Sequence, residues 1–370
     1  MTTEDLARMA RRYLTPQNMT ISLLWPKDSS SAETRPNETA IRALVEKIAA
    51  ERAISEAEQG LSRQRDGVWT STLANGLRLV VRENHAVPTV AVRVAMLGGI
   101  LTETPELNGI AEFTAGMLTR GTESRSAFQI AKDIEGIAGS LDGFAGRNTI
   151  GASGDVLAKD LDKGLELLAD ILLHPAFGQD EIERERRDLL AAIARREDDL
   201  ARFAFENFAA SLYERHPYRL PQLGTAETVG SVKRENLVNY LERHRVPENI
   251  VVSVVGDVDP KTVLAKIDSA FGGLAAAPFR REKSPTESPL EKPRVKTVHR
   301  TREQAHLVLG FPGTTVRSDD RFALEVLNTI LSGQGGRLFI ELRDKQSLAY
   351  SVTSLSVEGY DPGYFAVYMG

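Results

Sequence analysis

Residues 75–99 read NGLRLVVRENHAVPTVAVRVAMLGG, and residues 108–127 read NGIAEFTAGMLTRGTESRSA. The first stretch opens with Asn-Gly, a strong hairpin signal, and then alternates apolar and polar residues as strands do. The second has the apolar spacing of helices, which we place at 109–120 and 126–138. Strand runs and helix runs are therefore segregated, which favours an α+β domain with an antiparallel sheet over a doubly wound fold.

The same patterns continue downstream of these stretches. The further predicted elements are a hairpin, three long helices, a helix–turn–strand unit and a closing helix, at 141–156, 160–172, 179–201, 203–213, 235–255 and 260–270. Together they predict one complete domain over residues 66–274, in which helices cover an antiparallel sheet.

The helix–turn–strand unit occurs twice in the chain. Residues 4–24 read EDLARMARRYLTPQNMTISLL, residues 235–255 read ENLVNYLERHRVPENIVVSVV, and the two align without a gap. Both contain a Pro-x-Asn turn between an amphipathic helix and an alternating apolar strand. A looser echo links the strands at 91–100 and 305–314. The long period excludes a solenoid and indicates duplicated domains.

These units predict how the chain is divided. Residues 1–30 look like the last helix and strand of a preceding domain, and residues 31–65 read as a charged linker helix. After the complete domain at 66–274, residues 275–296 are a connector rich in Pro, Ser and charge, and residues 297–370 begin a second domain. The last unit has no helix–turn–strand of its own, so the copy at 4–24 is a candidate to complete it, within one molecule or by domain swapping.

Composition excludes several classes of protein. The 370 residues carry a net charge of −5 with both signs interspersed. The sequence therefore has neither a basic cluster that would bind nucleic acid nor a polybasic membrane patch. The chain has no cysteine, so disulfides, thiolate metal sites and a cysteine nucleophile are excluded. No apolar run reaches the roughly 18 residues of a membrane helix, and no signal peptide opens the sequence. We expect a soluble protein of the bacterial periplasm or cytoplasm.

The quoted stretches resemble the M16 family of zinc peptidases, which includes pitrilysin, insulinase and the mitochondrial processing peptidases. The resemblance continues, in the family's order, through LLADILLHPAFGQDEIERERRDLLAAI (167–193), VPENIVVSVVGDVDP (246–260) and GGRLFIELRDKQSLAYSV (335–352). It implies an α+β fold of duplicated M16/LuxS-like metallohydrolase domains. Each domain would have an antiparallel sheet covered by helices.

Members of this family carry the motif H-x-x-E-H on a helix. Two histidines one turn apart hold zinc, the glutamate takes a proton from the zinc-bound water, and a distant glutamate is the third protein ligand. By the resemblance, the four positions are occupied here by Glu112, Ala115, Gly116 and Ala192. Three of these residues have no donor atom in the side chain. We therefore expect no metal site in this chain and no peptide cleavage by it alone.

Other residues offer no replacement for the lost motif. The six histidines are His85, His174, His216, His244, His299 and His306. No two of them lie one helical turn apart and no three have close ligand spacing, so we interpret them as surface or turn residues. The glycines of SGQGGRLF (332–339) lack the Lys-Ser/Thr of a phosphate loop and read as a helix-breaking loop.

The resemblance assigns a substrate role to Arg343 and Tyr350, seven residues apart in ELRDKQSLAYSV. In the family such a pair faces the zinc across the cavity and holds the substrate backbone near the scissile bond. An arginine can bind a carbonyl oxygen by charge-assisted hydrogen bonds, and a tyrosine hydroxyl can donate to a developing oxyanion. From the residues alone, the alternative is an arginine that caps a helix and a tyrosine that packs in a strand.

The resemblance implies the non-catalytic half of a zinc endopeptidase. Such a half encloses an extended peptide for a zinc-bearing half, which lies in the same longer chain or in a partner subunit. Zinc is expected in that other half, and no cofactor in this chain. The alternative is a structural or peptide-binding subunit with no peptidase role. An active hydrolase of another class is disfavoured because the chain has no G-x-S-x-G motif.

Overall fold

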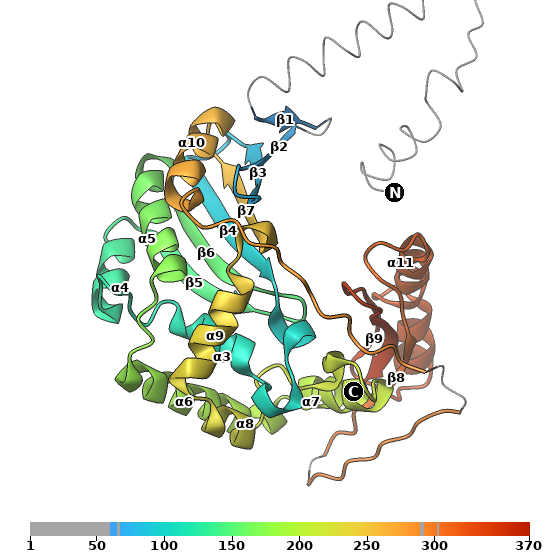
Figure 1. Ribbon diagram of the computed structural model, residues 1–370. Helices are drawn as coiled ribbons and strands as arrows, with labels where there is room; N and C mark the ends of the chain where they lie inside the picture. Colours follow the sequence, from blue (N-terminus) through green and yellow to red (C-terminus); the bar gives the residue numbers. More distant parts are fainter. Residues whose placement is uncertain (1–59, 65–66, 289–291, 302) are drawn as a thin grey trace, which may run out of the picture.

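The computed structural model describes residues 60–64, 67–288, 292–301 and 303–370. The prediction for residues 1–30, and that for 31–65 as far as residue 59, lie outside the described residues. Figure 1 shows a larger unit built around β4 and a smaller unit that contains β8 and α11. The chain passes from the larger unit to the smaller one through a connector that follows α10.

The larger unit is built on a seven-stranded sheet of order β1-β2-β3-β7-β4-β6-β5. Its strands are β1 (Ser62–Arg63), β2 (Val68–Thr72), β3 (Arg78–Glu83), β4 (Thr89–Leu97), β5 (Ser140–Ala145), β6 (Thr149–Leu157) and β7 (Ile250–Gly256). Neighbouring strands are antiparallel, except that β3 and β7 are parallel. The predicted α+β fold with a largely antiparallel sheet is confirmed. The parallel pair was not predicted; it arises because β7, late in the chain, inserts between two early strands.

Helices cover one face of this sheet (Figure 1). The helices of this unit are α3 (Ile110–Met117), α4 (Ala127–Glu135), α5 (Leu161–Leu173), α6 (Gln179–Ala194), α8 (Ala226–Ser231), α9 (Arg234–His244) and α10 (Pro260–Phe271). Helix α7 (Leu200–Leu212) lies instead against the smaller unit. Along β4 the residues Val90, Val92, Val94 and Met96 are buried, and those between them are more exposed. Within the described ranges, no helix has the length and apolar character that crossing a membrane requires.

Two predicted boundaries were wrong. The helix expected at 179–201 ends at Ala194, because Asp199 caps a new helix, α7, by accepting a hydrogen bond from the backbone nitrogen of Arg202 at 3.0 Å. The linker expected to run to residue 65 gives way earlier to β1, which pairs with Trp69 and Thr70 of β2. Gly60 precedes this strand with a φ of 65°, a conformation that ends regular structure.

The smaller unit contains a three-stranded antiparallel sheet of order β8-β10-β9. Its elements are β8 (Leu307–Pro312), α11 (Asp320–Leu331), the π-helical turn η9 (Phe339–Lys345), β9 (Val352–Val357) and β10 (Tyr364–Met369). One face packs on α7, where the Phe208 and Tyr364 rings meet edge to face at 5.1 Å. A side chain at Gly310 would collide with the Phe208 ring, so this glycine permits the close approach of β8. The other face carries α11, which accepts a hydrogen bond from Ser354 through Asn328.

A partly buried ionic cluster joins the two units, and it corrects the interpretation of the histidines. Asp361 of the smaller unit accepts bonds from Arg281 of the connector at 2.7 and 3.0 Å and lies 3.1 Å from Nε2 of His216. His216 is 4% exposed, and His244 is 2% exposed on α9. Neither is a surface residue, because each is held by hydrogen bonds that sequence spacing does not reveal. Burial lowers the pKa of both histidines.

Candidate functional site

The start of α3 is fixed by a buried carboxylate. Glu103 is 5% exposed and accepts hydrogen bonds from the backbone nitrogens of Gly109 and Ala111, both at 2.9 Å. The side chain of Asn108 donates to the same carboxylate at 2.7 Å. Burial raises the pKa of Glu103, and these three hydrogen bonds act in the opposite direction. A carboxylate at a helix N-terminus is electrostatically favourable, so Glu103 anchors the helix that carries three of the predicted site positions.

Glu112 and Ala115 occupy the first two of these positions on α3. Glu112 is half-buried and accepts a hydrogen bond from Nε2 of Gln222 at 3.3 Å. Burial raises the pKa of the Glu112 carboxyl, although this hydrogen bond opposes the change. Ala115 is buried, and its carbonyl oxygen lies so close to Gly143 of β5 that a Cβ there would be 1.9 Å away. Helix α3 is therefore packed tightly on β5, and Ala115 offers only a methyl group.

Gly116 faces a carboxylate from the neighbouring helix α6. A Cβ at this position would lie 2.2 Å from Oε1 of Glu185, so Glu185 occupies the space where a side chain at 116 would begin. Glu185 is 9% exposed and accepts hydrogen bonds from Nε and Nη2 of Arg120 at 3.0 and 2.7 Å. Arg120 also donates to Asp188 at 2.7 Å. The ion pair of Glu185 with Arg120, which follows α3, thus fills the space beside Gly116.

Ala192 lies on α6, seven residues after Glu185 and thus on nearly the same face of the helix. Helices α3 and α6 pack together, so the structure brings the four predicted positions onto two neighbouring helices. The donors there are the carboxylates of Glu112 and Glu185, without an imidazole. This set does not fit zinc, which takes four ligands rich in histidine or cysteine. Among the described residues, no group of three or more His, Cys, Asp or Glu is gathered for any metal.

Arg343 and Tyr350 are brought together in the smaller unit. Arg343 lies in η9 and its guanidinium carbon is 5.0 Å from the centroid of the Tyr350 ring and 4.6 Å from that of Phe339. Tyr350 is 75% exposed. In the part of the chain that the structure describes, no carboxylate pairs with this guanidinium, so its N–H groups are available. The exposure of Tyr350 differs from the alternative of a packed tyrosine, whereas Arg343 stands in the last turn of η9, where a basic side chain favours the end of a helix.

Two sequence-family models match the chain. Residues 78–226 match the model for insulinase (peptidase family M16), and residues 231–370 match the model for the peptidase M16 inactive domain. An uncharacterized zinc protease of Streptomyces coelicolor is 31% identical over 326 residues, which is 84% of this chain and 70% of that protein. The chain belongs to the M16 family. YmxG of Bacillus subtilis, also an uncharacterized zinc protease, is 32% identical over 304 residues, or 81% of this M16 chain and 72% of YmxG.

Solved structures agree with this assignment at the level of fold. The peptidase M16 inactive domain from Pseudomonas fluorescens has a TM-score of 0.73 with this chain. It is 23% identical, and the match covers 82% of this chain and 74% of that one. The predicted fold class and family resemblance are both confirmed.

Sequence reasoning missed the residues that surround the predicted motif positions of this M16 chain. Glu185, Arg120 and Gln222 make the contacts described above, and none was singled out. Two of them had a signal in the sequence: Glu185 is two helical turns before Ala192, and Arg120 is one turn after Gly116. Gln222 lies in a loop, and nothing in the local pattern predicts that it reaches α3.

Proposed function

We propose that this chain is the non-catalytic half of an M16 zinc endopeptidase, which holds an extended peptide while a zinc-bearing half cleaves it. The observation that carries the proposal is the contrast between the site at α3 and the site at η9. The position of the zinc motif is filled by the ion pair of Glu185 with Arg120, while Arg343 and Tyr350 remain available. A chain that lacks the zinc site but keeps the substrate-binding pair is what we expect if one half of the enzyme cleaves the peptide and the other half binds it.

The chemistry at α3 supports the absence of catalysis by this chain alone. Zinc-dependent hydrolysis needs an activated water and a base to take its proton. Ala115, at the position of that base, has no ionisable group, and Gly116 has no side chain at all. The remaining carboxylate, Glu112, has a raised pKa and a hydrogen bond to Gln222. We therefore propose that the chain binds no zinc and needs no other cofactor.

The geometry at η9 supports peptide binding. Two aromatic rings flank the Arg343 guanidinium, which limits its motion while leaving N–H groups to donate. A peptide backbone presents carbonyl oxygens, which a guanidinium binds without regard to the side chains. The exposed Tyr350 hydroxyl is a second donor beside it. An extended peptide is thus the proposed ligand.

The proposed setting follows the family's organisation. We propose that residues 66–274 form one complete domain and residues 297–370 part of a second, joined by the connector at 275–296. The zinc-bearing half would be part of a longer tandem chain or a separate subunit. The curated relatives named above are bacterial, which supports a bacterial periplasm or cytoplasm. A structural subunit with no peptidase role is the competing proposal, and peptide binding distinguishes the two.

The test is the affinity of the purified chain for fluorescent unstructured peptides, measured by anisotropy. Arg343→Ala should weaken binding at least tenfold, because it removes the charged donor that holds the backbone. The matched control is Arg317→Ala, since Arg317 also lies 5.0 Å from an aromatic centroid, that of Tyr360. Equal affinity in the two variants, or the absence of any binding by the parent chain, would favour the structural subunit.

A further inference from the structure

The turn that leads into the edge strand occurs in both units, and each copy contains a residue with a left-handed backbone. The chain order is α3, α4, β5, β6 in the larger unit and α11, η9, β9, β10 in the smaller one, and β5 and β9 each lie at one edge of their sheet. Ala138 precedes β5 with a φ of 53°, and Ser347 precedes β9 with a φ of 52°. The two units therefore share this turn between a helix and the edge strand.

The smaller unit has a longer connection after this turn. A single residue separates Ala138 from β5, whereas four residues, 348–351, separate Ser347 from β9. Tyr350 is one of these four and lies in neither the helix nor the strand. The direction in which the chain approaches Tyr350 is therefore set by the turn at Ser347.

The turn closes on the residue that carries the guanidinium. The backbone oxygen of Arg343 accepts a hydrogen bond from the backbone nitrogen of Ser347 at 3.0 Å, and that of Leu342 accepts one from Leu348 at 2.8 Å. A left-handed residue just past a helix end permits such bonds, because it turns the chain back over the last helical turn. Here the reversal brings the centroid of the Tyr350 ring to 5.0 Å from the guanidinium carbon of Arg343.

Serine is an unfavourable residue for this position. In the left-handed conformation the Cβ atom of an L-residue crowds the backbone, and glycine, asparagine and aspartate tolerate this best. The Ser347 side chain is exposed, and in the described part of the chain its hydroxyl makes no hydrogen bond. The backbone hydrogen bonds of the turn must therefore hold the strained conformation. Non-glycine residues in this conformation cluster at binding sites and active sites, where the surrounding structure fixes them.

We propose that Ser347 is a positioning residue of the peptide site, whose left-handed backbone holds Tyr350 beside Arg343 so that both side chains donate hydrogen bonds to one stretch of peptide backbone. This role rests on the proposed function of the pair. The carbonyl oxygens on one side of an extended peptide recur roughly every 7 Å. Two donors can bind one such peptide together only if their spacing is fixed, and the turn at Ser347 fixes it.

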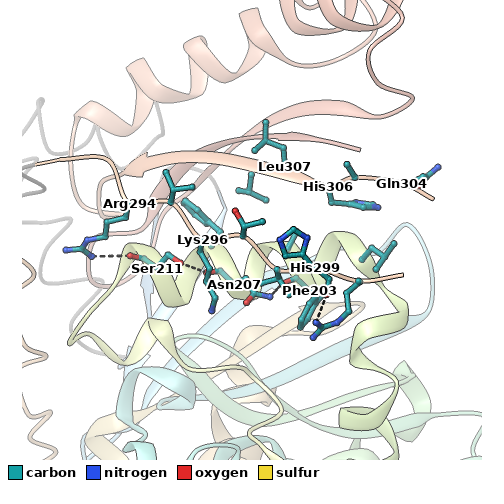
Figure 2. A pocket seen from close by; sticks show the side chains of 18 of the residues that line it. Phe203, Asn207, Ser211, Arg294, Lys296, His299, Gln304, His306 and Leu307 are labelled. Atoms are coloured by element: carbon teal, nitrogen blue, oxygen red, sulfur yellow. Dashed lines mark hydrogen bonds between the residues drawn. The ribbon is translucent and has the colours of Figure 1, made fainter. Parts of the chain in front are cut away.

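The join between the two units does not involve this turn. The smaller unit meets α7 and the connector along a groove of about 550 Å³ (Figure 2). Arg294 of the connector donates to the backbone oxygen of Ser211 of α7 at 3.1 Å, and His306 lines the groove from the smaller unit. Among the described residues that line the groove, none belongs to 339–352. A change at Ser347 should therefore leave this join intact and act on the peptide site.

The test compares variants that allow different backbone conformations. Ser347→Val introduces a β-branched residue, which the left-handed region excludes, and Ser347→Gly removes the restriction. With the fluorescent unstructured peptides that test the proposed function, we expect Ser347→Val to bind about tenfold more weakly than the parent chain, and Ser347→Gly to bind within about twofold of it. Full binding by the glycine variant would assign the effect to the backbone and not to the hydroxyl.

The matched control is Ala138→Val in the larger unit. Ala138 has nearly the same φ as Ser347 and also leads into an edge strand, so valine imposes the same strain away from the pair. Both valine variants should lower the urea midpoint of unfolding, but Ala138→Val should bind peptide as the parent chain does. In a Tyr350→Ala background, Ser347→Val should weaken binding by less than about twofold, because the turn acts through Tyr350.

A second measurement needs no peptide. In a chain with selectively labelled tyrosine and arginine, nuclear Overhauser effects between the Tyr350 ring and the Arg343 side chain should be present in the parent and in Ser347→Gly. They should be absent in Ser347→Val. Their persistence in Ser347→Val would overturn the proposed positioning.

The binding results separate this role from the proposed function. Equal affinity of Ser347→Val and the parent chain, equal weakening by Ala138→Val, or a glycine variant as weak as the valine variant would each overturn the role of Ser347. If such a result accompanies a loss of binding in Arg343→Ala, the proposed function stands and only the role of Ser347 fails. A parent chain that binds no peptide would overturn both.

Discussion

Substitution of Gly116 by alanine tests the packing of α3 against α6. In an exposed helix interior, replacing glycine with alanine stabilises a protein by up to about 1 kcal/mol, because alanine loses less conformational entropy. At Gly116 we expect the opposite sign. A Cβ there would lie 2.2 Å from Oε1 and 2.6 Å from Cδ of Glu185, distances that require the Glu185 side chain to move.

The magnitude follows from what Glu185 would lose. Its side chain has an exposed fraction of 11%, and its carboxylate accepts two hydrogen bonds from Arg120, at 2.7 and 3.0 Å. Disrupting a buried pair so that one charge is left without its partner costs about 3–5 kcal/mol. Part of this cost is avoided, since Arg120 keeps its bond to Asp188 and the Glu185 side chain is flexible. With the gain in helix propensity subtracted, we expect a net destabilisation of about 2 kcal/mol.

The assay is the urea midpoint of unfolding, followed by circular dichroism. The matched control is Gly230→Ala in α8, where nothing lies within 4 Å of the new methyl group, and this variant should be neutral or stabilised. In the background of Glu185→Ala, the cost of Gly116→Ala should largely disappear, because the two effects share one contact. A Gly116→Ala variant with the parent midpoint or a higher one would refute the assigned contact with Glu185.

Two further outcomes follow from the structure. Asn249→Ala should lower the unfolding free energy by about 2–3 kcal/mol, because it leaves the backbone nitrogen and oxygen of Leu97 and the backbone oxygen of His244 without their hydrogen bonds to Asn249. Thermal unfolding measures this change. An unchanged melting temperature would contradict the role of Asn249. Burial opposes the charge of Asp361, but hydrogen bonds from Arg281, Ser284 and His216 outweigh it and lower the pKa of Asp361 to about 2. This folded pKa is below the unfolded value of about 3.9, so the stabilisation is present above pH 4 and is lost as pH falls toward 2. Asp361→Asn should flatten that acid transition in near-ultraviolet circular dichroism, and an identical transition in the variant would argue against the cluster as its cause.

The strands and most helices could be predicted because their signals are local. The alternation in residues 75–99 predicted strands where β3 and β4 lie, and the glycine-rich loop after α11 breaks that helix as expected, with Gly333 at a φ of 79°. The break between α6 and α7 was predicted at residue 202, too late in the chain, because a continuous helical pattern hid the capping role of Asp199. The parallel placement of β7 beside β3 depends on a long-range insertion, which periodicity does not encode.

At the candidate site, too, the long-range contacts could not be predicted from the sequence. Family resemblance assigned the motif positions to Glu112, Ala115, Gly116 and Ala192, and this assignment stays a prediction. The close approach of Glu185 to Gly116 was found only in the structure. Glu185 lies on another helix, and contacts between helices are not visible in a single sequence. Burial of His216 was missed for the same reason, since Asp361 lies far along the chain.

The central claim is that this chain has the M16 fold without the metal chemistry of its zinc-bearing relatives. The most direct test is the zinc content of the purified chain by elemental analysis, with cleavage of a quenched peptide mixture followed with and without added zinc. We predict less than about a tenth of a zinc ion per chain and no cleavage in either condition, because the donor set at α3 and α6 does not fit zinc. Stoichiometric zinc with cleavage that a chelator abolishes would contradict the account.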